Sequence, residues 1–183
     1  CATLPMGFSH AVFIAQSIHQ HVLYSNDVVP QLYNLCSLSN PFISDHVIHG
    51  IYIDDLFLFG TNQEMVRCIQ QKALTAYAVC GLTSNIKKTV YPTCDTVTVI
   101  GVDVDGKRCT VTPTTKSLVS LVQATSLVCS MSSITGEQLS ILIGHWTWNL
   151  LLNRPLLSIL YQCYRFINVA KQQLYYIWTS VRN

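Results

Sequence analysis

Two adjacent aspartates, Asp54 and Asp55, stand inside the apolar stretch IYIDDLFLFG at residues 51–60. An ionised carboxylate is costly to bury unless it is paired or bound to a metal, and two neighbouring carboxylates also repel each other. We therefore expect something positive to meet them. Carboxylate oxygens are preferred ligands of Mg²⁺, and two such ions can stabilise both the attacking and the leaving oxygen of a phosphoryl transfer. A solvated Asp-Asp turn without chemistry is the alternative interpretation.

The residues on either side of the pair predict a hairpin with the acids at its tip. HVIHGIYI (46–53) and LFLFG (56–60) are β-branched or aromatic runs, separated only by the two aspartates. Because side chains alternate across a strand, the carboxylates should point to opposite faces of the hairpin unless the turn redirects one of them. Apolar strands on both sides should hold the pair rigidly at the edge of a sheet.

The elements around this hairpin follow from apolar periodicity and from turn residues. Residues 4–23 begin with a loop that contains Pro and Gly and continue with apolar residues at helical spacing, which predict a helix. Residues 24–45 are rich in Ser, Asn, Asp and Pro and are predicted to be mostly loop. A helix is predicted over 62–80, with Thr61 or Asn62 as its N-cap.

The second half of the chain is predicted to form one more hairpin and then only helices. Asp105-Gly106, between 96–104 and 107–112, is a strong turn signal. We expect no strand after Pro113. Helices are predicted near 114–130, 136–151, 155–168 and 169–181. The sequence thus predicts an α+β fold, an antiparallel sheet with packed helices, followed by an all-helical unit.

The composition is unusually apolar, and the few charges are segregated. Half of the 183 residues are hydrophobic and 11% are charged, against about 25% in typical globular chains. Such a chain buries a large core or lacks a segment that should cover it, and a first residue of Cys rather than Met suits a piece of a longer protein. Residues 1–66 carry no Lys or Arg and five acids (−5), whereas residues 67–183 carry eleven basic residues and four acids (+7). The acidic part could hold cations, and the basic part could meet polyanions.

The spacing of the cysteines argues against a zinc finger, and polar residues within the longest apolar stretch argue against a membrane span. The eight cysteines form no C-x-x-C pair, so we interpret them as buried apolar side chains in a reducing, intracellular compartment, with cytoplasm and nucleus both open. The apolar stretch 139–161 is long enough to suggest a membrane span. It contains His145, Asn149, Arg154 and Pro155, however, and we expect a pair of amphipathic core helices instead.

Four blocks of sequence resemble reverse transcriptases. Tyr52-Ile53-Asp54-Asp55 resembles the family's Y-x-D-D signature, and LPMGFSHAVFIAQ (4–16) is similar to its L-P-x-G-F/W-x-x-S/A-P-x-x-F-Q block. GLTSNIKKT (81–89) resembles the G-L-x-x-N-x-x-K-T block, and VTVIGVDVDGKRCTVTP (97–113) resembles the hairpin that holds the primer. The first long block matches in register at Leu4, Pro5, Gly7, Phe8 and Gln16.

The resemblance implies a fold, an activity and partners. It implies a partial polymerase palm at 1–113 and a helical thumb or connection-like region at 114–183. The implied activity is that of a retroelement RNA-directed DNA polymerase, a nucleotidyltransferase. It would use two Mg²⁺ ions, with Mn²⁺ as a possible substitute, an RNA or DNA template, a DNA primer and dNTPs.

The resemblance also implies roles for single residues. Asp54 and Asp55 would be catalytic metal ligands, and Lys88 would face the triphosphate and donate a proton to the leaving pyrophosphate. Contacts to nucleotide or template are implied for Pro5, Gly7, Phe8, Gln16 and Tyr52. A primer grip is implied at Gly101, Val102 and Asp103. Without the resemblance, an ordinary turn glycine, a surface glutamine and a half-buried strand tyrosine explain several of these positions equally well.

The match departs from the family in ways that limit the expected activity. The family's third catalytic carboxylate and the fingers lie upstream of the first block, so the 183 residues alone are expected to be inactive and to need that N-terminal segment as a partner. Ala11-Val12 replaces the usual Ser-Pro or Ala-Pro, and Met6 replaces a common Gln. One alternative is a non-catalytic retroelement relic that acts as a nucleic-acid-binding or scaffold module. Another is a template-independent or RNA-making polymerase on the same palm.

Overall fold

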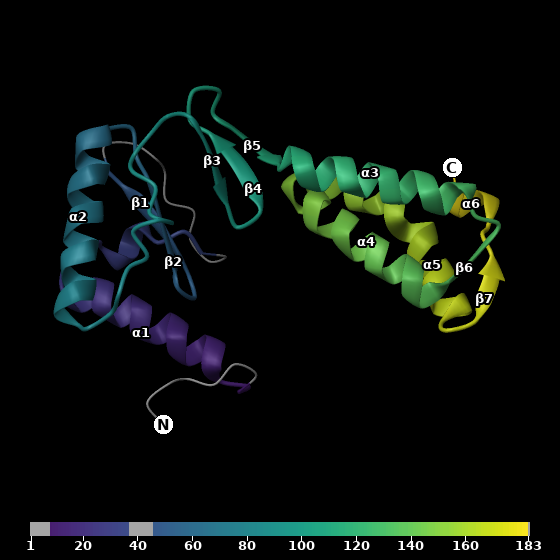
Figure 1. Ribbon diagram of the computed structural model, residues 1–183, viewed down its shortest axis with the longest axis horizontal. Helices are drawn as coiled ribbons and strands as arrows, with labels where there is room; N and C mark the ends of the chain where they lie inside the picture. The colour runs from purple at the N-terminus through teal and green to yellow at the C-terminus, as the bar shows by residue number, and fades with distance from the viewer. Residues whose placement is uncertain (1–7, 37–45, 183) are drawn as a thin grey trace. The chain divides into compact units, whose positions relative to one another are not determined.

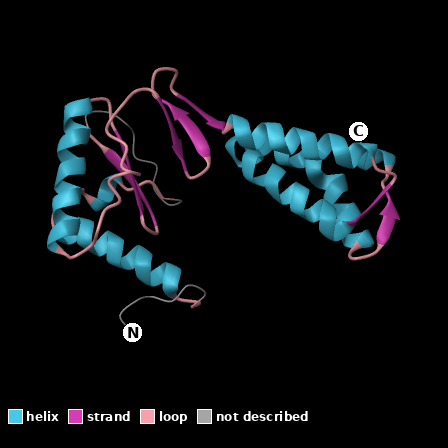
Figure 2. Ribbon diagram, viewed as in Figure 1, coloured by secondary structure: helices cyan, strands magenta, loops and turns pink. Residues whose placement is uncertain are grey.

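The computed structural model describes residues 8–36 and 46–182. The chain divides into two compact units, residues 1–93 and 94–183, which we describe separately. Helices and small antiparallel sheets occur in the described residues (Figures 1 and 2), so the predicted α+β class is confirmed at this coarse level. Within the described residues, no helix is both long enough and apolar enough to cross a bilayer.

The first unit packs helices against a hairpin. Its elements are α1 (Ala11–Ser25), the short 3-10 helix η1 (Gln31–Tyr33), β1 (Ile48–Tyr52), β2 (Asp55–Phe59) and α2 (Gln63–Val79). Buried residues of α1, α2 and the segment after α1 form its core, with side chains of the hairpin packed against them. The predicted first helix, first hairpin and second helix are confirmed.

The two ends of α2 show how local sequence sets the boundaries of that helix. The Asn62 side-chain oxygen accepts hydrogen bonds from the backbone N–H groups of Glu64 (2.9 Å) and Met65 (3.1 Å). These bonds satisfy two donors that a helix N-terminus leaves unpaired. Gly81, just beyond the helix, has a φ of 75°, a left-handed conformation that glycine adopts at little cost. Of the two predicted caps, Asn62 is the one whose side chain makes the capping bonds.

The second unit begins with a three-stranded meander. β3 (Thr96–Val99), β4 (Val102–Asp105) and β5 (Thr110–Pro113) pair in that order, all antiparallel. The predicted single strand over 96–104 is therefore wrong. It is broken at Ile100 and Gly101, whose φ angles of 46° and 77° form a turn. The predicted hairpin after Asp105 is present, but its two-residue turn at Asp105-Gly106 is wrong: Asp105 ends β4 and pairs with Thr110, so a four-residue loop (106–109) joins β4 to β5.

The prediction that only helices follow Pro113 is wrong. The helices α3 (Thr115–Ser130), α4 (Gly136–Leu150) and α5 (Tyr161–Ala170) are joined by a 3-10 segment, η2 (Leu151–Leu160). In addition, β6 (Ser133–Thr135) pairs antiparallel with β7 (Leu174–Tyr176), and only a short α6 (Thr179–Arg182) follows. Each of these strands has three residues, too few to show a period of two, and their pairing is decided by packing.

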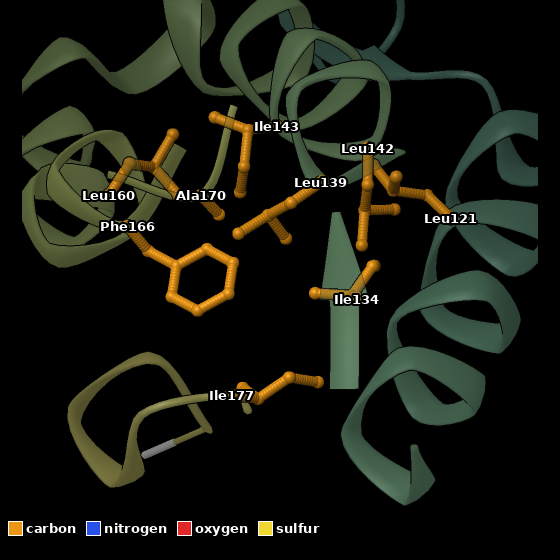
Figure 3. Close-up of a cluster of buried hydrophobic side chains, with 9 residues drawn as sticks. All are labelled: Leu121, Ile134, Leu139, Leu142, Ile143, Leu160, Phe166, Ala170 and Ile177. Atoms are coloured by element: carbon orange, nitrogen blue, oxygen red, sulfur yellow. The ribbon is translucent and has the colours of Figure 1, made fainter. Parts of the chain in front are cut away.

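The helical run from α4 to α5 bends at η2. Asn153 has non-helical angles (φ −139°, ψ 75°), and Pro155 follows it. A proline inside a helix lacks the N–H needed for the backbone ladder and its ring clashes with the preceding turn. The bend lets α4 and α5 pack on each other, and their side chains build the core with Leu121 and Ile134 (Figure 3).

Two further expectations are affected by these observations. The cysteines at 36, 68, 80, 94, 109 and 129 are exposed, and Cys163 is half-buried, so for the described residues the expectation of buried cysteines is wrong. The division into a palm at 1–113 and a thumb at 114–183 stays a prediction. The boundary between the two compact units lies earlier in the chain, between Thr93 and Cys94. The β3–β5 sheet therefore belongs to the second unit.

Candidate metal centre on the first hairpin

The two aspartates lie at the tip of the β1–β2 hairpin, as predicted. Tyr52 pairs with Asp55, and Ile51 pairs with Leu56, which leaves Ile53 and Asp54 as a two-residue loop. Asp54 is thus a turn residue, and Asp55 is the first residue of β2. The direction in which the Asp54 side chain points therefore depends on the turn conformation, whereas that of Asp55 follows from its position in the strand.

The loop carries backbone strain at Ile53. This residue has a φ of 54°, whereas Asp54 lies outside the left-handed region. Positive φ at the first loop position alone corresponds to a type II′ turn, in which that position is normally glycine. A β-branched residue there is an outlier, with a cost of about 1–3 kcal/mol. Such strain persists only where the surroundings hold it in place, so it is a reason to ask what the turn does.

Side chains of α1 hold the strained turn. Gln16 Nε2 donates to the Ile51 carbonyl (3.0 Å), and the Ile53 N–H donates to Gln16 Oε1 (2.7 Å). His19 Nδ1 lies 2.9 Å from the carbonyl oxygen of Ile53. Residues three apart on a helix share a face, so Gln16 and His19 reach the same turn. Sequence reasoning missed His19, and its spacing from Gln16 is the signal that could have indicated it.

Gln16 therefore has a role that the sequence did not indicate. The resemblance implies a contact to nucleotide or template, which stays a prediction. In the structure the side-chain amide of Gln16 donates one hydrogen bond to the hairpin backbone and accepts another from it. A single side chain that pairs with both Ile51 and Ile53 ties α1 to the last residues before the aspartates.

The expectation that the aspartates are buried is wrong, whereas the expectation that something positive meets them stays a prediction. Asp54 and Asp55 are both exposed, because Asp54 lies in the loop and Asp55 in the first strand pair beside it, at the turn end of the hairpin. Neither forms an ion pair with another described residue. Water can solvate both carboxylates, so this site pays no desolvation penalty and remains open to a cation.

The donor set fits Mg²⁺ as part of a site. Two carboxylates on adjacent residues suit Mg²⁺, which is commonly bound through one or two carboxylates, with water and substrate phosphates completing its coordination. In residues 8–36 and 46–182, no group of three or more His, Cys, Asp or Glu side chains is close enough to hold a metal. The described residues thus supply two carboxylate ligands, and the third carboxylate that the resemblance implies stays a prediction.

Other residues implied by the resemblance lie in various places. Pro5 and Gly7 fall outside the described residues, and Phe8 is exposed shortly before α1. Tyr52 is 52% exposed at the end of β1, opposite Asp55. The structure thus brings Gln16, Tyr52 and the two aspartates together on one hairpin and its neighbouring helix.

Lys88 lies in an exposed turn after α2. The Asn85 side chain accepts from the Lys87 N–H (3.1 Å), and its backbone carbonyl accepts from the Lys88 N–H (3.0 Å). Asn85 therefore shapes the turn that presents both lysines to solvent. Lys88 forms no ion pair with Asp54 or Asp55, and its implied role in proton donation remains a prediction.

The residues of the implied primer grip belong to the second unit. Gly101 is the second residue of the β3–β4 turn, and Val102 begins β4. Asp103 accepts a hydrogen bond from the hydroxyl of Thr98 (2.7 Å), its partner across the sheet. This bond fixes the Asp103 side chain within the sheet, whereas the backbone of the turn stays exposed.

Comparison with known proteins gives no match. No protein-family model, no curated protein and no solved structure matches this chain significantly. The resemblance to reverse transcriptases therefore rests on the four sequence blocks, and the α+β architecture by itself identifies no particular fold.

Proposed function

We propose that this chain is part of a reverse transcriptase, an RNA-directed DNA polymerase of a retroelement, with a palm that carries Asp54 and Asp55 and a helical thumb. The observation that carries the proposal is the strained hairpin tip. Two exposed carboxylates follow a residue with a φ of 54°, in a turn that Gln16 and His19 hold through three hydrogen bonds. The support from α1 holds the turn in one conformation, as a metal site with fixed ligands needs.

In this proposal Asp54 and Asp55 hold Mg²⁺ beside the primer end and the incoming dNTP. When bound, the metal would stabilise the charge that develops as the primer 3′-hydroxyl displaces pyrophosphate from the α-phosphate. Tyr52, exposed next to Asp55, would pack against the end of the primer. Lys88 would approach the triphosphate, and the turn at Gly101 would contact the primer backbone.

A second candidate function is a nucleic-acid-binding or scaffold module without catalysis. It is favoured by the donor count, because the described residues bring no third acidic or histidine ligand to the aspartates. This candidate keeps the basic second unit as a surface for polyanions but assigns no chemistry to the hairpin tip.

Primer extension tests the leading proposal. The assay uses a longer chain that includes the residues encoded upstream of Cys1, with template-primer, Mg²⁺ and dNTPs. We expect Asp54→Asn to reduce extension by more than about a hundredfold, since each metal contributes several kcal/mol to the transition state. Asp27→Asn is the matched control, because Asp27 is an exposed aspartate of the same unit, in a left-handed turn that Asn also tolerates.

The outcomes separate the two candidates. Loss of extension in Asp54→Asn with an unchanged thermal unfolding midpoint supports the polymerase. Extension retained in Asp54→Asn shows that the pair is not catalytic. If the unmodified longer chain does not extend a primer but binds template-primer, the non-catalytic module is the better assignment.

A further inference from the structure

We propose that His19 and Tyr77 are positioning residues, which select the turn conformation that presents Asp54 and Asp55. What the aspartates do in that position rests on the proposed function. The role of His19 and Tyr77 is carried by a hydrogen-bonded chain that runs from α2 through α1 to the loop and that involves neither carboxylate.

His19 is the centre of this chain. Its side chain is 7% exposed, with Nδ1 at 2.9 Å from the Ile53 carbonyl oxygen and Nε2 at 2.6 Å from the Tyr77 hydroxyl. A carbonyl oxygen can only accept, so Nδ1 has to carry the proton of the ring. In the neutral imidazole, Nε2 then accepts from the hydroxyl of Tyr77. The two contacts together fix both the tautomer and the orientation of the ring.

Tyr77 supports His19 from α2. The two rings meet edge to face, with 5.4 Å between their centroids. Burial raises the pKa of Tyr77 well above its ordinary value, so its hydroxyl keeps its proton and stays a donor. Because α2 packs in the same core as α1, and Tyr77 packs against that core, Tyr77 links the loop to the core of the unit.

The carbonyl that His19 holds is the one that distinguishes two turn types. Types I′ and II′ differ by a flip of the peptide between the two loop residues, here Ile53 and Asp54. In the II′ form only Ile53 has positive φ, as observed, whereas in the I′ form Asp54 would adopt it as well. A hydrogen bond from His19 to the Ile53 carbonyl is available only in one of the two forms. His19 therefore selects the direction in which Asp54 leaves the turn.

Substitutions that each imitate one ring nitrogen test this proposal. Asn places its side-chain amide near the position of Nδ1, and Gln places its amide near that of Nε2. His19→Asn can thus keep the hydrogen bond to the Ile53 carbonyl. His19→Gln keeps the contact to the Tyr77 hydroxyl but loses the hydrogen bond to the Ile53 carbonyl. Tyr77→Phe removes only the hydroxyl. His21→Asn is the control on the same helix, since His21 is exposed and bonds only Ser25 among the described residues.

The readouts are NMR measurements on the 183-residue chain. The three-bond HN–Hα coupling of Asp54 reports its φ, and hydrogen exchange at the Ile53 amide reports its bond to Gln16. For His19→Gln we expect a shift of the Asp54 coupling towards positive φ and exchange at Ile53 about tenfold faster, with Ala73 in α2 unchanged. We expect His19→Asn to keep values near those of the natural chain, and Tyr77→Phe to speed exchange about threefold.

Several results would overturn the positioning role. Equal acceleration at Ile53 and Ala73 in His19→Gln would mean that His19 only stabilises the core. An unchanged Asp54 coupling in both His19→Gln and Tyr77→Phe, or imidazole ¹⁵N shifts that place the His19 proton on Nε2 alone, would also contradict it. If His19→Gln fails to fold, the coupling and exchange in Tyr77→Phe and His19→Asn decide the matter.

Titration with MnCl₂ separates this inference from the proposed function. If Mn²⁺ broadens the Asp54 and Asp55 signals in the natural chain and less so in His19→Gln, both stand. If Mn²⁺ never broadens them while the coupling still depends on His19, the metal site fails and the positioning role stands. If broadening is the same in His19→Gln as in the natural chain, the turn does not need His19 to present the carboxylates, and the positioning role fails.

Discussion

The β1–β2 and β3–β4 hairpins meet the same conformational problem in different ways. Each has a two-residue loop that begins with isoleucine in the left-handed region, Ile53 with a φ of 54° and Ile100 with a φ of 46°. In the second hairpin the next residue is Gly101, which takes a φ of 77° and completes a type I′ turn. In the first hairpin the next residue is Asp54, so this loop contains no glycine that could adopt positive φ at little cost.

The difference shows where the stability of each turn comes from. The β1–β2 loop is held by three hydrogen bonds from α1, and at about 0.5–1.5 kcal/mol each they can offset a strain of about 1–3 kcal/mol. For Ile100 and Gly101, no side-chain hydrogen bond to the loop backbone is found among the described residues. The flanking Thr98–Asp103 bond lies within the same sheet. One turn is thus stabilised by tertiary contacts, and the other by its own sequence and its sheet.

The largest effect is expected from breaking the α1 support. Gln16→Leu removes two hydrogen bonds and leaves the Ile53 N–H and the Ile51 carbonyl without that partner. We expect the free energy of unfolding of the first unit to fall by about 2–3 kcal/mol, with the second unit unchanged. All three tryptophans, Trp146, Trp148 and Trp178, lie in the second unit, so their fluorescence in urea follows that unit alone. Amide signals of β1 and β2 follow the first.

Gln20→Leu is the control for this prediction. Gln20 lies on the same helix and is partly buried, and its side chain forms no hydrogen bond with another described residue. It should change the stability of the first unit by less than about 0.5 kcal/mol. Equal losses in Gln16→Leu and Gln20→Leu would mean that the support of the turn is not the cause.

An intermediate effect is expected from acid, and only in the first hairpin. His49 on β1 is fully buried, its Nε2 contacts the Tyr24 hydroxyl at 3.2 Å, and its Nδ1 has no hydrogen-bond partner among the described residues. Burial lowers the pKa of His49 to about 4, below the ordinary value of about 6.5. Between these pH values the unfolded chain binds more protons than the folded chain. The stability contribution is therefore complete above about pH 6.5 and is lost as the pH falls towards 4.

Urea unfolding at pH 7 and pH 4.5 measures this effect. Relative to His49→Phe, we expect the natural chain to lose about 1–2 kcal/mol more of the stability of its first unit at the lower pH. The meander β3–β5 contains no histidine and should not share this loss. The same pH dependence in the natural chain and in His49→Phe would assign the effect to other groups.

The smallest effect is expected from improving the second turn. Ile100→Asn creates Asn-Gly, the pair preferred in type I′ turns, because Asn tolerates positive φ better than a β-branched residue. We expect the second unit to gain about 0.5–1 kcal/mol, measured by tryptophan fluorescence in urea. Gly101→Ala should act in the opposite direction. A loss of stability in Ile100→Asn would show that the Ile100 side chain, 39% exposed, contributes more by packing than its backbone costs.

The parts of the structure that could be predicted are those whose signals are local. Asn62 as a cap, a hairpin turn directly after Asp105 and the apolar runs around Asp54 and Asp55 each act through neighbours in the chain, and all are present in the structure. The turn at Ile100-Gly101 was missed because the apolar alternation continues through it. The β6–β7 pair was missed because its two strands are short and distant in sequence.

The sequence by itself determined the hairpin and the placement of two carboxylates at its tip, because apolar alternation and an interrupting pair of acids are enough to specify a strand, a turn and a strand. Tertiary structure alone decided the conformation of that turn. An isoleucine at positive φ is unfavourable by itself, and it is held by Gln16, His19 and Tyr77, which are far from it in sequence and adjacent to it only after α1 and α2 have packed.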